Sequence, residues 1–193
     1  PQDWQGFLQV WKDASELNSL VMDALHQQDV PAVRFAPSSF IVSDNRSPVR
    51  CLYEPISEAL SHRLVPVVFG DVIFDLSTGG TIYSTEEVFN ILAQHITPQR
   101  MLIAGIEAGV FADYPSREQI ITEITPENHP KIDHDLLTAD TIDVTGGMLS
   151  KVKIMLEMVE QYDHLMVEIF SGLDAGNIKT ALLDDAPGTS IHA

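Results

Sequence analysis

The sequence is poor in cysteine, in basic residues and in long apolar runs, and each shortage excludes a class of protein. The one cysteine, Cys51, has no disulfide partner within the 193 residues, which favours a reducing, cytoplasmic setting. No run of about 18 apolar residues occurs, so no membrane-spanning helix is expected. Lys and Arg number 11 against 28 Asp and Glu, a formal net charge of −17. A chain this acidic lacks the basic face that nucleic-acid binding requires, so no nucleic-acid partner is expected.

The sequence does contain an alternation of helical and strand patterns. Hydrophobic residues make up 45% of the chain, enough for the core of one domain. Apolar spacing predicts helices over 13–26, 54–64, 85–96, 146–162 and 176–183. Apolar runs predict strands over 30–37, 49–53, 65–71, 100–111, 164–170 and 188–191. The turn-rich segment PSSFIVSDNRSP predicts a loop, and 112–143 predicts loops with one short helix or strand. This alternation predicts a three-layer α/β/α sandwich with a mainly parallel sheet.

Residues 70–87, GDVIFDLSTGGTIYSTEE, combine a predicted hairpin with the start of a helix. The segments VIFD and TIY flank the turn LSTGG, as expected for two antiparallel strands. Ser84 to Glu87 matches the S/T-x-x-E capping box, in which Glu87 bonds back to the N-cap backbone, and Thr85 is an alternative cap. Glu86 is then the carboxylate available for other work, or it complements the helix dipole.

Four glycine-bearing turns fall at predicted strand ends or at a helix start, where α/β proteins bind ligands. They are Gly70-Asp71, Gly105 to Gly109, Ser171-Gly172 and Gly146-Gly147. Glycine allows backbone N–H groups to approach an anion closely, and a helix N-terminus adds further donors. Asp71 either points into a cleft or is a turn residue bonded to nearby backbone.

Lys151 is one of only five lysines, and its position is informative. A helix starting at Gly147 places Lys151 in about the first turn, where a cation opposes the helix dipole by a few tenths of a kcal/mol, roughly. A phosphate bound by Gly146, Gly147 and Lys151 would resolve that conflict. The alternative is an exposed lysine beside Lys153 on a solvated face. GGMLSK lacks the P-loop spacing, and the seven histidines lack zinc-ligand spacing, so no metal site is expected among the side chains.

Several motifs, taken together and in order, resemble the amino acid kinase superfamily, and isopentenyl phosphate kinases most closely. The sequence runs PVVFGDVIFD, GGTIYSTEEVFNILA, LIAGIEAGVFADYP, IDVTGGMLSKVKIMLEM, GNIKTALL and GTSI, and DVTGGM-x-x-K is the most specific part. The resemblance covers about residues 13–192. It implies one kinase-like domain over 1–193, with a substrate-side lobe over about 1–98 and a nucleotide-side lobe over about 99–193.

The resemblance also implies an activity and a set of site residues. The reaction would be phosphoryl transfer from ATP, with Mg²⁺, to isopentenyl phosphate, in a protein that forms homodimers. Such catalysis is mostly positioning and charge stabilisation. Lys151 and Glu86 would be catalytic, and Gly70 and Asp71 would lie on the substrate side. The ATP-binding residues would be Gly105, Ile106, Gly109, Gly146, Gly147 and Lys151.

The sequence also departs from the family pattern. The family opens with a strand carrying Lys and Gly-Gly and with a Gly-rich loop ending in His, and neither precedes residue 13, so we expect that an N-terminal segment is missing. Ile106 and Ala108 replace two aspartates, and Ser84-Thr85-Glu86 replaces Ser-Gly-Asp. Two alternatives therefore stay open: a fosfomycin-type or other phosphonate or phosphate kinase, and a nucleotide-binding protein of the same fold with impaired catalysis.

Overall fold

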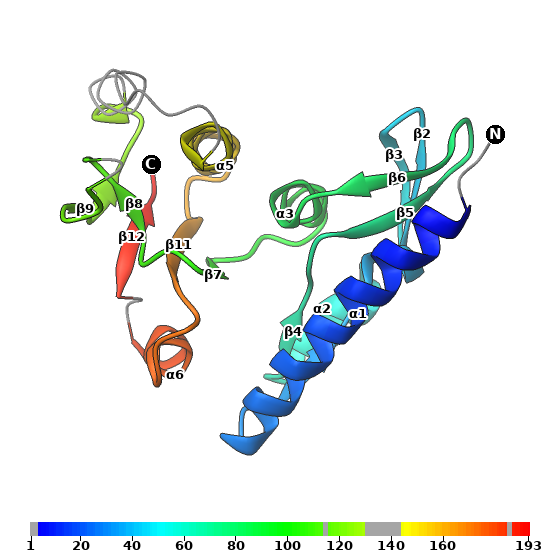
Figure 1. Cartoon of the computed structure of the whole chain (residues 1–193), viewed down its shortest axis with the longest axis horizontal. Coiled ribbons are helices and arrows are strands. Elements are labelled where there is room, and N and C mark those ends of the chain that lie inside the picture. Colours follow the sequence, from blue (N-terminus) through cyan, green and yellow to red (C-terminus); the bar gives the residue numbers. More distant parts are fainter. Residues whose placement is uncertain (1–3, 114–115, 130–143, 185–186) are drawn as a thin grey trace. The chain divides into compact units, whose positions relative to one another are not determined.

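The computed structural model describes residues 4–113, 116–129, 144–184 and 187–193. The chain divides into two compact units, Pro1–Ile96 and Thr97–Ala193, whose elements are labelled in Figure 1. Each unit combines helices with parallel and antiparallel strand pairs, so the predicted α/β class is confirmed. Within the described ranges, no helix has both the length and the apolarity to cross a membrane. The functional division into substrate and nucleotide lobes stays a prediction.

The first unit is built on a four-stranded sheet in the order β3-β2-β5-β6. Its strands are β2 (Ile41–Asp44), β3 (Ser47–Cys51), β5 (Asp71–Asp75) and β6 (Gly79–Tyr83). The central pair β2–β5 is parallel, and both outer pairs are antiparallel. A two-stranded parallel sheet pairs β1 (Ala32–Arg34) with β4 (Val65–Val67). The helices are α1 (Trp4–Gln27), α2 (Glu54–Ser61), α3 (Thr85–Ala93) and the 3-10 turn η1 (Pro37–Ser39).

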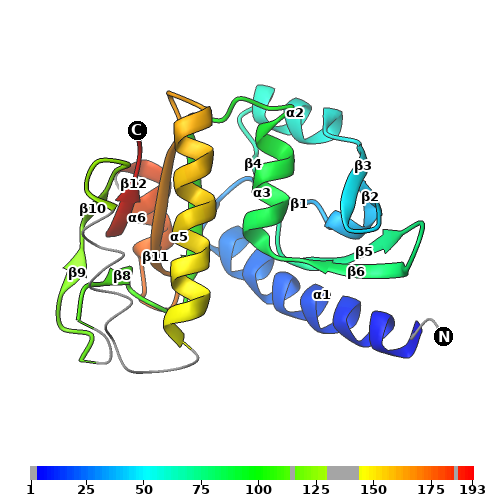
Figure 2. The same ribbon diagram turned by 90° about the horizontal axis from the view of Figure 1, so that it is seen from above.

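Helices α1 and α3 pack on opposite faces of this sheet, because successive side chains of a strand point to opposite sides. On one face, α1 runs along β5 and β6 (Figure 2). There the Phe7 ring lies 4.8 Å from the ring of Phe74. A Cβ on Gly80 would lie 2.7 Å from Cδ2 of Phe7, so the absence of a side chain lets α1 approach β6.

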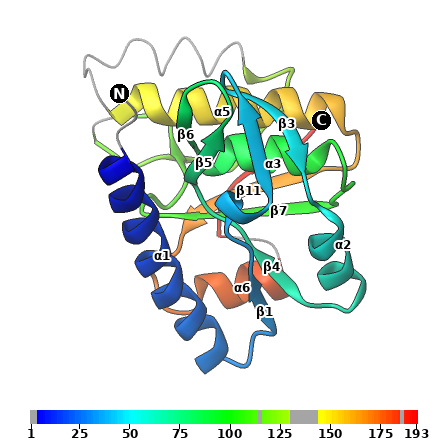
Figure 3. The same ribbon diagram turned by 90° about the vertical axis from the view of Figure 1, so that its right-hand side faces the viewer.

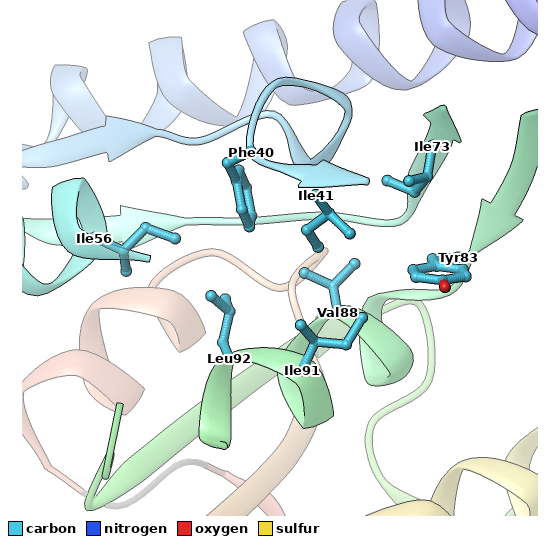
Figure 4. Close-up of a cluster of buried hydrophobic side chains, with 8 residues drawn as sticks. All are labelled: Phe40, Ile41, Ile56, Ile73, Tyr83, Val88, Ile91 and Leu92. Carbon is cyan, nitrogen blue, oxygen red and sulfur yellow. The ribbon is translucent and has the colours of Figure 1, made fainter. Parts of the chain in front are cut away.

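On the other face, the hydrophobic core of the first unit joins η1, β2, α2, β5, β6 and α3 (Figure 4). Ile73 of β5 and Val88 of α3 are fully buried in it. Removing buried methyl groups from such a site costs about 2–5 kcal/mol for Ile to Ala. The cluster comprises Phe40, Ile41, Ile56, Ile73, Tyr83, Val88, Ile91 and Leu92.

A buried carboxylate, that of Asp75 at the end of β5, fixes two turns of the first unit. It accepts hydrogen bonds from the Asn45 and Arg46 N–H groups, at 3.2 and 2.8 Å, in the β2–β3 turn. It also accepts from the Ser77 and Thr78 N–H groups, at 3.0 and 2.8 Å, in the β5–β6 turn. These donors, led by the Arg46 N–H, hold the pKa of the Asp75 carboxyl well below its usual range.

The structure corrects three sequence-based expectations in the first unit. The segment PSSFIVSDNRSP is not all loop, because η1, β2 and the start of β3 lie within it. The expected strand over 65–71 is broken, because β4 pairs with β1 whereas β5 pairs with β2 and β6, so the chain changes sheets at Gly70. Helix α1 begins at Trp4, so it extends beyond the predicted range 13–26 in the direction in which Phe7 and Trp11 continue the apolar stripe. The predicted hairpin is confirmed, with Val72 opposite Ile82.

The described part of the second unit is a four-stranded sheet in the order β10-β12-β11-β7 with two helices. Strand β11 (Met166–Ser171) pairs in parallel with β7 (Arg100–Gly105) and antiparallel with β12 (Gly188–Ile191), which pairs in parallel with β10 (Glu123–Ile124). Strands β8 (Val110–Phe111) and β9 (Ile120–Ile121) form a small antiparallel pair. Helices α5 (Val144–Gln161) and α6 (Asn177–Leu183) lie on opposite sides of β7 and β11 (Figure 3). Of the predicted loop region 112–143, residues 114–115 and 130–143 lie outside the described residues.

An ion pair ties α6 to the start of β7. The Nε of Arg100 donates to Oε2 of the buried Glu168 on β11 at 2.9 Å, and its Nη2 contacts the same oxygen. The Nη2 also donates to the carbonyls of Ala181 and Asp184, each at 2.9 Å. Because the Glu168 side chain is 2% exposed, losing the Arg100 contact would cost more than losing a surface ion pair.

We expect Asp75→Asn to lower stability in a pH-dependent way. The folded-state pKa of Asp75 is depressed, so its contribution is complete above an unfolded-state pKa of about 3.9 and is lost as the pH falls through the folded-state value. Urea unfolding midpoints of wild type and Asp75→Asn should therefore differ by a nearly constant amount from about pH 5 to 8, and should approach each other only as the pH falls below about 4 toward the depressed folded-state pKa. A difference that does not change between pH 2 and pH 7 would contradict this role.

Candidate functional site

In the first unit, the predicted substrate-side turn Gly70-Asp71 lies against the start of α3. Asp71 pairs with Tyr83 across the β5–β6 ladder, so the two segments are neighbours. The Gly70 N–H donates to Oγ1 of Thr85, the first residue of α3, at 3.0 Å. A Cβ on Gly70 would lie 3.2 Å from the Tyr83 carbonyl oxygen and 3.3 Å from the Thr85 nitrogen. The glycine is therefore needed for this close approach of two backbones.

Asp71 itself is buried, and its carboxylate is bonded to backbone. Oδ2 accepts from the Ser38 N–H of η1 at 3.1 Å, and Oδ1 accepts from the Val72 N–H at 2.8 Å. Of the two alternatives that the sequence left open, this geometry is the backbone-bonded one. Asp71 opens β5 instead of ending a strand, which corrects the expected placement. Its role toward a substrate stays a prediction.

The start of α3 has the predicted capping box. The Ser84 N–H donates to Oε2 of Glu87 at 2.7 Å, and the Glu87 N–H donates to Oγ of Ser84 at 3.2 Å. Thr85 is therefore not the cap. Arg46 buttresses this turn, because its Nη2 donates to Oε1 of Glu87 at 3.1 Å. Glu86, the predicted catalytic carboxylate, is 2% exposed in the first turn of α3, where the helix dipole favours an anion.

An apolar groove of about 310 Å³ lies between α1 and the β5–β6 hairpin, one residue from the Gly70-Asp71 turn. Phe7 and Val10 line it from α1, and Val72 and Ile82 line it from the strands. Val72 and Ile82 are register partners and so face the groove together. Sequence analysis did not identify this groove, because its walls are 60 residues or more apart in the chain.

In the second unit, two predicted glycine turns meet at one edge of the sheet. Gly105 at the end of β7 pairs with Ser171 at the end of β11, and the Gly172 N–H donates to the Gly105 carbonyl at 2.8 Å. The carboxyl ends of parallel strands are where α/β sheets bind ligands. A Cβ on Gly105 would meet no atom within 4 Å, so this backbone borders open space. Ile106 follows it with 77% of its surface exposed.

Two residues of β12, Gly188 and Thr189, hold the loop after β7 against this strand, and sequence analysis did not predict either as a site residue. Thr189 Oγ1 accepts from the Val110 N–H at 2.8 Å and donates to the Ile121 carbonyl at 2.7 Å. A Cβ on Gly188 would lie 2.1 Å from the Ile169 carbonyl oxygen and 2.8 Å from that of Ala108. The predicted ATP-binding residue Gly109 also packs on Thr189, because a Cβ on Gly109 would lie 2.8 Å from Oγ1 of Thr189. The loop is thus held in one conformation.

Gly146, Gly147 and Lys151 lie on α5, but not as expected. The helix begins at Val144, so the glycine pair is inside its first turn and Lys151 comes seven residues after Val144. The helix dipole acts within about one turn of the terminus, so the predicted conflict between Lys151 and the dipole does not apply. Lys151 is exposed on α5, whereas Met155 and Met158 are buried as core residues.

Comparisons with known proteins agree with this architecture. The family model of the amino acid kinase family matches residues 4–170. The chain belongs to the amino acid kinase family. Its relatives include an isopentenyl phosphate kinase of Methanocaldococcus jannaschii, 32% identical over 189 residues, which cover 97% of this chain and 68% of that protein. Another, of Methanothermobacter thermautotrophicus, is 30% identical over 193 residues, which cover 96% of this chain and 70% of that protein.

Solved structures give the same family fold. A structure of an isopentenyl phosphate kinase matches with a TM-score of 0.66 and 26% identity, covering 92% of this chain and 66% of that one. The N-acetylglutamate synthase of Neisseria gonorrhoeae shares the fold, with a TM-score of 0.60 and 12% identity over 84% of this chain and 38% of that one. The amino acid kinase family consists of phosphotransferases acting on phosphate or carboxylate groups, so the kinase class expected from the sequence is confirmed at the family level.

Among the described residues, no group of three or more His, Cys, Asp or Glu side chains could hold a metal ion. Mg²⁺ commonly keeps several waters and binds through substrate phosphates with one or two carboxylates. Asp71 and Glu86 are the buried carboxylates of the candidate site of the first unit, whereas Ile106 and Ala108 supply no ligand oxygen from their side chains.

We expect two glycine substitutions in the second unit to differ sharply in their effect on folding. Gly188→Ala places a methyl group against two backbone carbonyls and should cost about 1–3 kcal/mol or more. Gly105→Ala faces open space and should change stability by no more than about 0.5 kcal/mol. Urea unfolding of the two variants measures both values. Equal losses would show that the loop after β7 is not clamped as described.

Proposed function

We propose that this amino acid kinase transfers the γ-phosphoryl group of Mg-ATP to isopentenyl phosphate. The observation that carries the proposal is the relationship to two isopentenyl phosphate kinases at 32% and 30% identity over almost the whole chain. The first unit would hold the phosphate acceptor, and the second would hold the nucleotide. In such a reaction the protein contributes positioning and charge stabilisation more than covalent chemistry.

The groove in the first unit supports an acceptor with an apolar tail. Phe7, Val10, Val72 and Ile82 offer aliphatic and aromatic surface, which suits a branched five-carbon chain. The groove begins next to the Gly70-Asp71 turn, where the backbone is held by Thr85. We assign Gly70 and Asp71 to the substrate side on this basis. Each buried methylene of a tail would contribute about 0.8 kcal/mol to binding.

The paired strand ends in the second unit support a nucleotide site. We assign Gly105, Ile106 and Gly109 to ATP, because their loop is rigid and borders open space. We assign Gly146 and Gly147 to the phosphates, because they lie in the first turn of α5, beside the N–H groups at the start of the helix that have no helical partner. Lys151 would stabilise the charge of the transferring phosphoryl group, and Glu86 would position the acceptor or its metal ion.

We also propose that the protein acts as a homodimer in the cytoplasm. The setting is supported by the single cysteine, since reducing compartments keep thiols free of disulfides. The dimer is supported by exposed apolar side chains of α1, since large apolar patches mark association surfaces. They are Trp4, Leu8, Trp11, Leu17 and Leu20. Light scattering of the purified full-length protein measures the oligomeric state.

One alternative is supported by a specific observation. Ile106 and Ala108 stand where carboxylates were expected, so their side chains bring no negative charge to the loop after β7. A nucleotide-binding protein with impaired catalysis, or a phosphonate kinase of the fosfomycin type, would be compatible with that change. The acceptor assay below separates these alternatives from the main proposal.

We expect full-length protein with Mg-ATP to release ADP in the presence of isopentenyl phosphate, and to do so with a much lower KM than with methyl phosphate. The tail accounts for the difference, because methyl phosphate leaves the groove empty. Fosfomycin, UMP and acetylglutamate serve as the other acceptors. ATP binding without ADP release for any acceptor would refute the kinase proposal, and a preference for fosfomycin would favour the phosphonate alternative.

Lys151→Ala should lower kcat for isopentenyl phosphate by about 100-fold or more, because a charge-assisted contact in the transition state is lost. Lys153→Ala is the matched control, since Lys153 is also an exposed lysine of α5 and should leave kcat within about twofold. Equal rates for the two variants would contradict the assignment of Lys151.

A further inference from the structure

We propose that Arg117 binds the polyphosphate of the nucleotide, and that Glu107 holds the Arg117 guanidinium at the site until the nucleotide arrives. The inference deepens the proposed function, on which it rests, by naming a second cation for the nucleotide. Sequence analysis did not identify either residue. The structure places both at the loop that follows β7.

The contact is direct. Nη1 of Arg117 lies 3.1 Å from Oε1 of Glu107, and both side chains are partly exposed, at 41% and 26%. Glu107 stands between Gly105 and Gly109, in the loop that borders open space at the carboxyl end of β7. The ion pair therefore places the Arg117 guanidinium at the carboxyl end of β7, the edge of the sheet where a ligand would bind.

Backbone contacts position Arg117 from the other side. Its N–H donates to the Asp113 carbonyl at 3.2 Å. The Asp113 carboxylate accepts from the next two N–H groups, those of Glu118 at 3.1 Å and Gln119 at 2.9 Å. The Ala112 N–H then donates to the Gln119 carbonyl at 2.9 Å, which continues the β8–β9 ladder. Arg117 thus projects from an ordered position on a short hairpin.

A nucleotide bound at the loop after β7 needs a cation there to offset the negative charge of Glu107. The described Lys and Arg residues of the second unit are Arg100, Arg117, Lys151, Lys153 and Lys179. Arg100 binds Glu168 at the start of β7, the opposite end of the strand from Gly105. Glu107 brings a negative charge to the glycine loop, and in the absence of Arg117 that charge would repel a nucleotide tail.

It is favourable for Arg117 to exchange Glu107 for the polyphosphate of ATP. The Arg117–Glu107 ion pair is partly exposed, and ion pairs of this kind are weak. A polyphosphate carries more charge and offers paired oxygens that match the fork of the guanidinium. Bound ATP would therefore take over Arg117, with no change in covalent structure.

The test is nucleotide binding by calorimetry on full-length protein without acceptor. We expect Arg117→Ala to weaken ATP binding by about tenfold or more, since a charge-assisted contact is lost, and to leave AMP binding within about twofold. Glu107→Gln should strengthen ATP binding by about threefold, because a repelling charge is removed. Arg63→Ala is the matched control, since Arg63 is an exposed arginine of the first unit with a similar left-handed backbone and should change neither affinity.

The double variant decides whether Arg117 touches the phosphates. In a Glu107→Gln background, Arg117→Ala should still weaken ATP binding by about tenfold if the contact is direct. No effect in that background would overturn the proposal, because Arg117 would then act only by neutralising Glu107. Equal losses of ATP and AMP affinity, or none, would also overturn it. Wild type that binds ATP through Arg117 yet transfers nothing to isopentenyl phosphate would refute the proposed function and leave this inference standing.

Discussion

The buried carboxylate of Asp75 is the constraint on which the first unit depends. It holds two turns that are 30 residues apart and so fixes the backbone of Arg46. The Arg46 side chain then reaches Glu87, which closes the cap of α3. The first residue of that helix, Thr85, in turn accepts the N–H of Gly70. The predicted substrate turn is therefore held by a series of polar contacts that begins at the far end of the sheet, with partly buried contacts at Asp75 and Gly70 and an exposed one between Arg46 and Glu87.

The second unit fixes its candidate loop in a different way, with a hydroxyl and the absence of side chains. Thr189 acts as acceptor and donor at once, so one Oγ1 links the backbones at Val110 and Ile121. Gly188 allows β12 to approach β11 and the loop after β7 more closely than any other residue would permit. Rigid loops of this kind suit a reaction in which orientation supplies much of the rate enhancement.

The elements that sequence reasoning predicted correctly are those set by neighbours in the chain. The capping box of Ser84 and Glu87 and the hairpin of β5 and β6 depend on residues within about 12 positions, so their patterns are visible in the sequence. Strand β2 was missed because its apolar residues are few and lie among turn formers; its place is set by pairing with β5, more than 30 residues away. The start of α5 was misplaced because glycine has a low helix propensity, which the surrounding structure overrides at Gly146 and Gly147.

The candidate site was less predictable than the fold, because its charges are paired over long distances in the sequence. The family resemblance singled out Lys151 and the glycines, but it contained no information on Glu107 and Arg117, whose pairing depends on the course of the β8–β9 hairpin. The net charge of −17 is equally uninformative about the site, since it sums over a surface on which exposed charges are screened within about 8–10 Å. Arg100 illustrates the point. It lies at the start of β7, the end away from the proposed nucleotide site, and its charge is neutralised by Glu168. Whether an acidic chain can bind a polyphosphate is decided by the few cations that the fold brings to one loop, and not by how many the sequence contains.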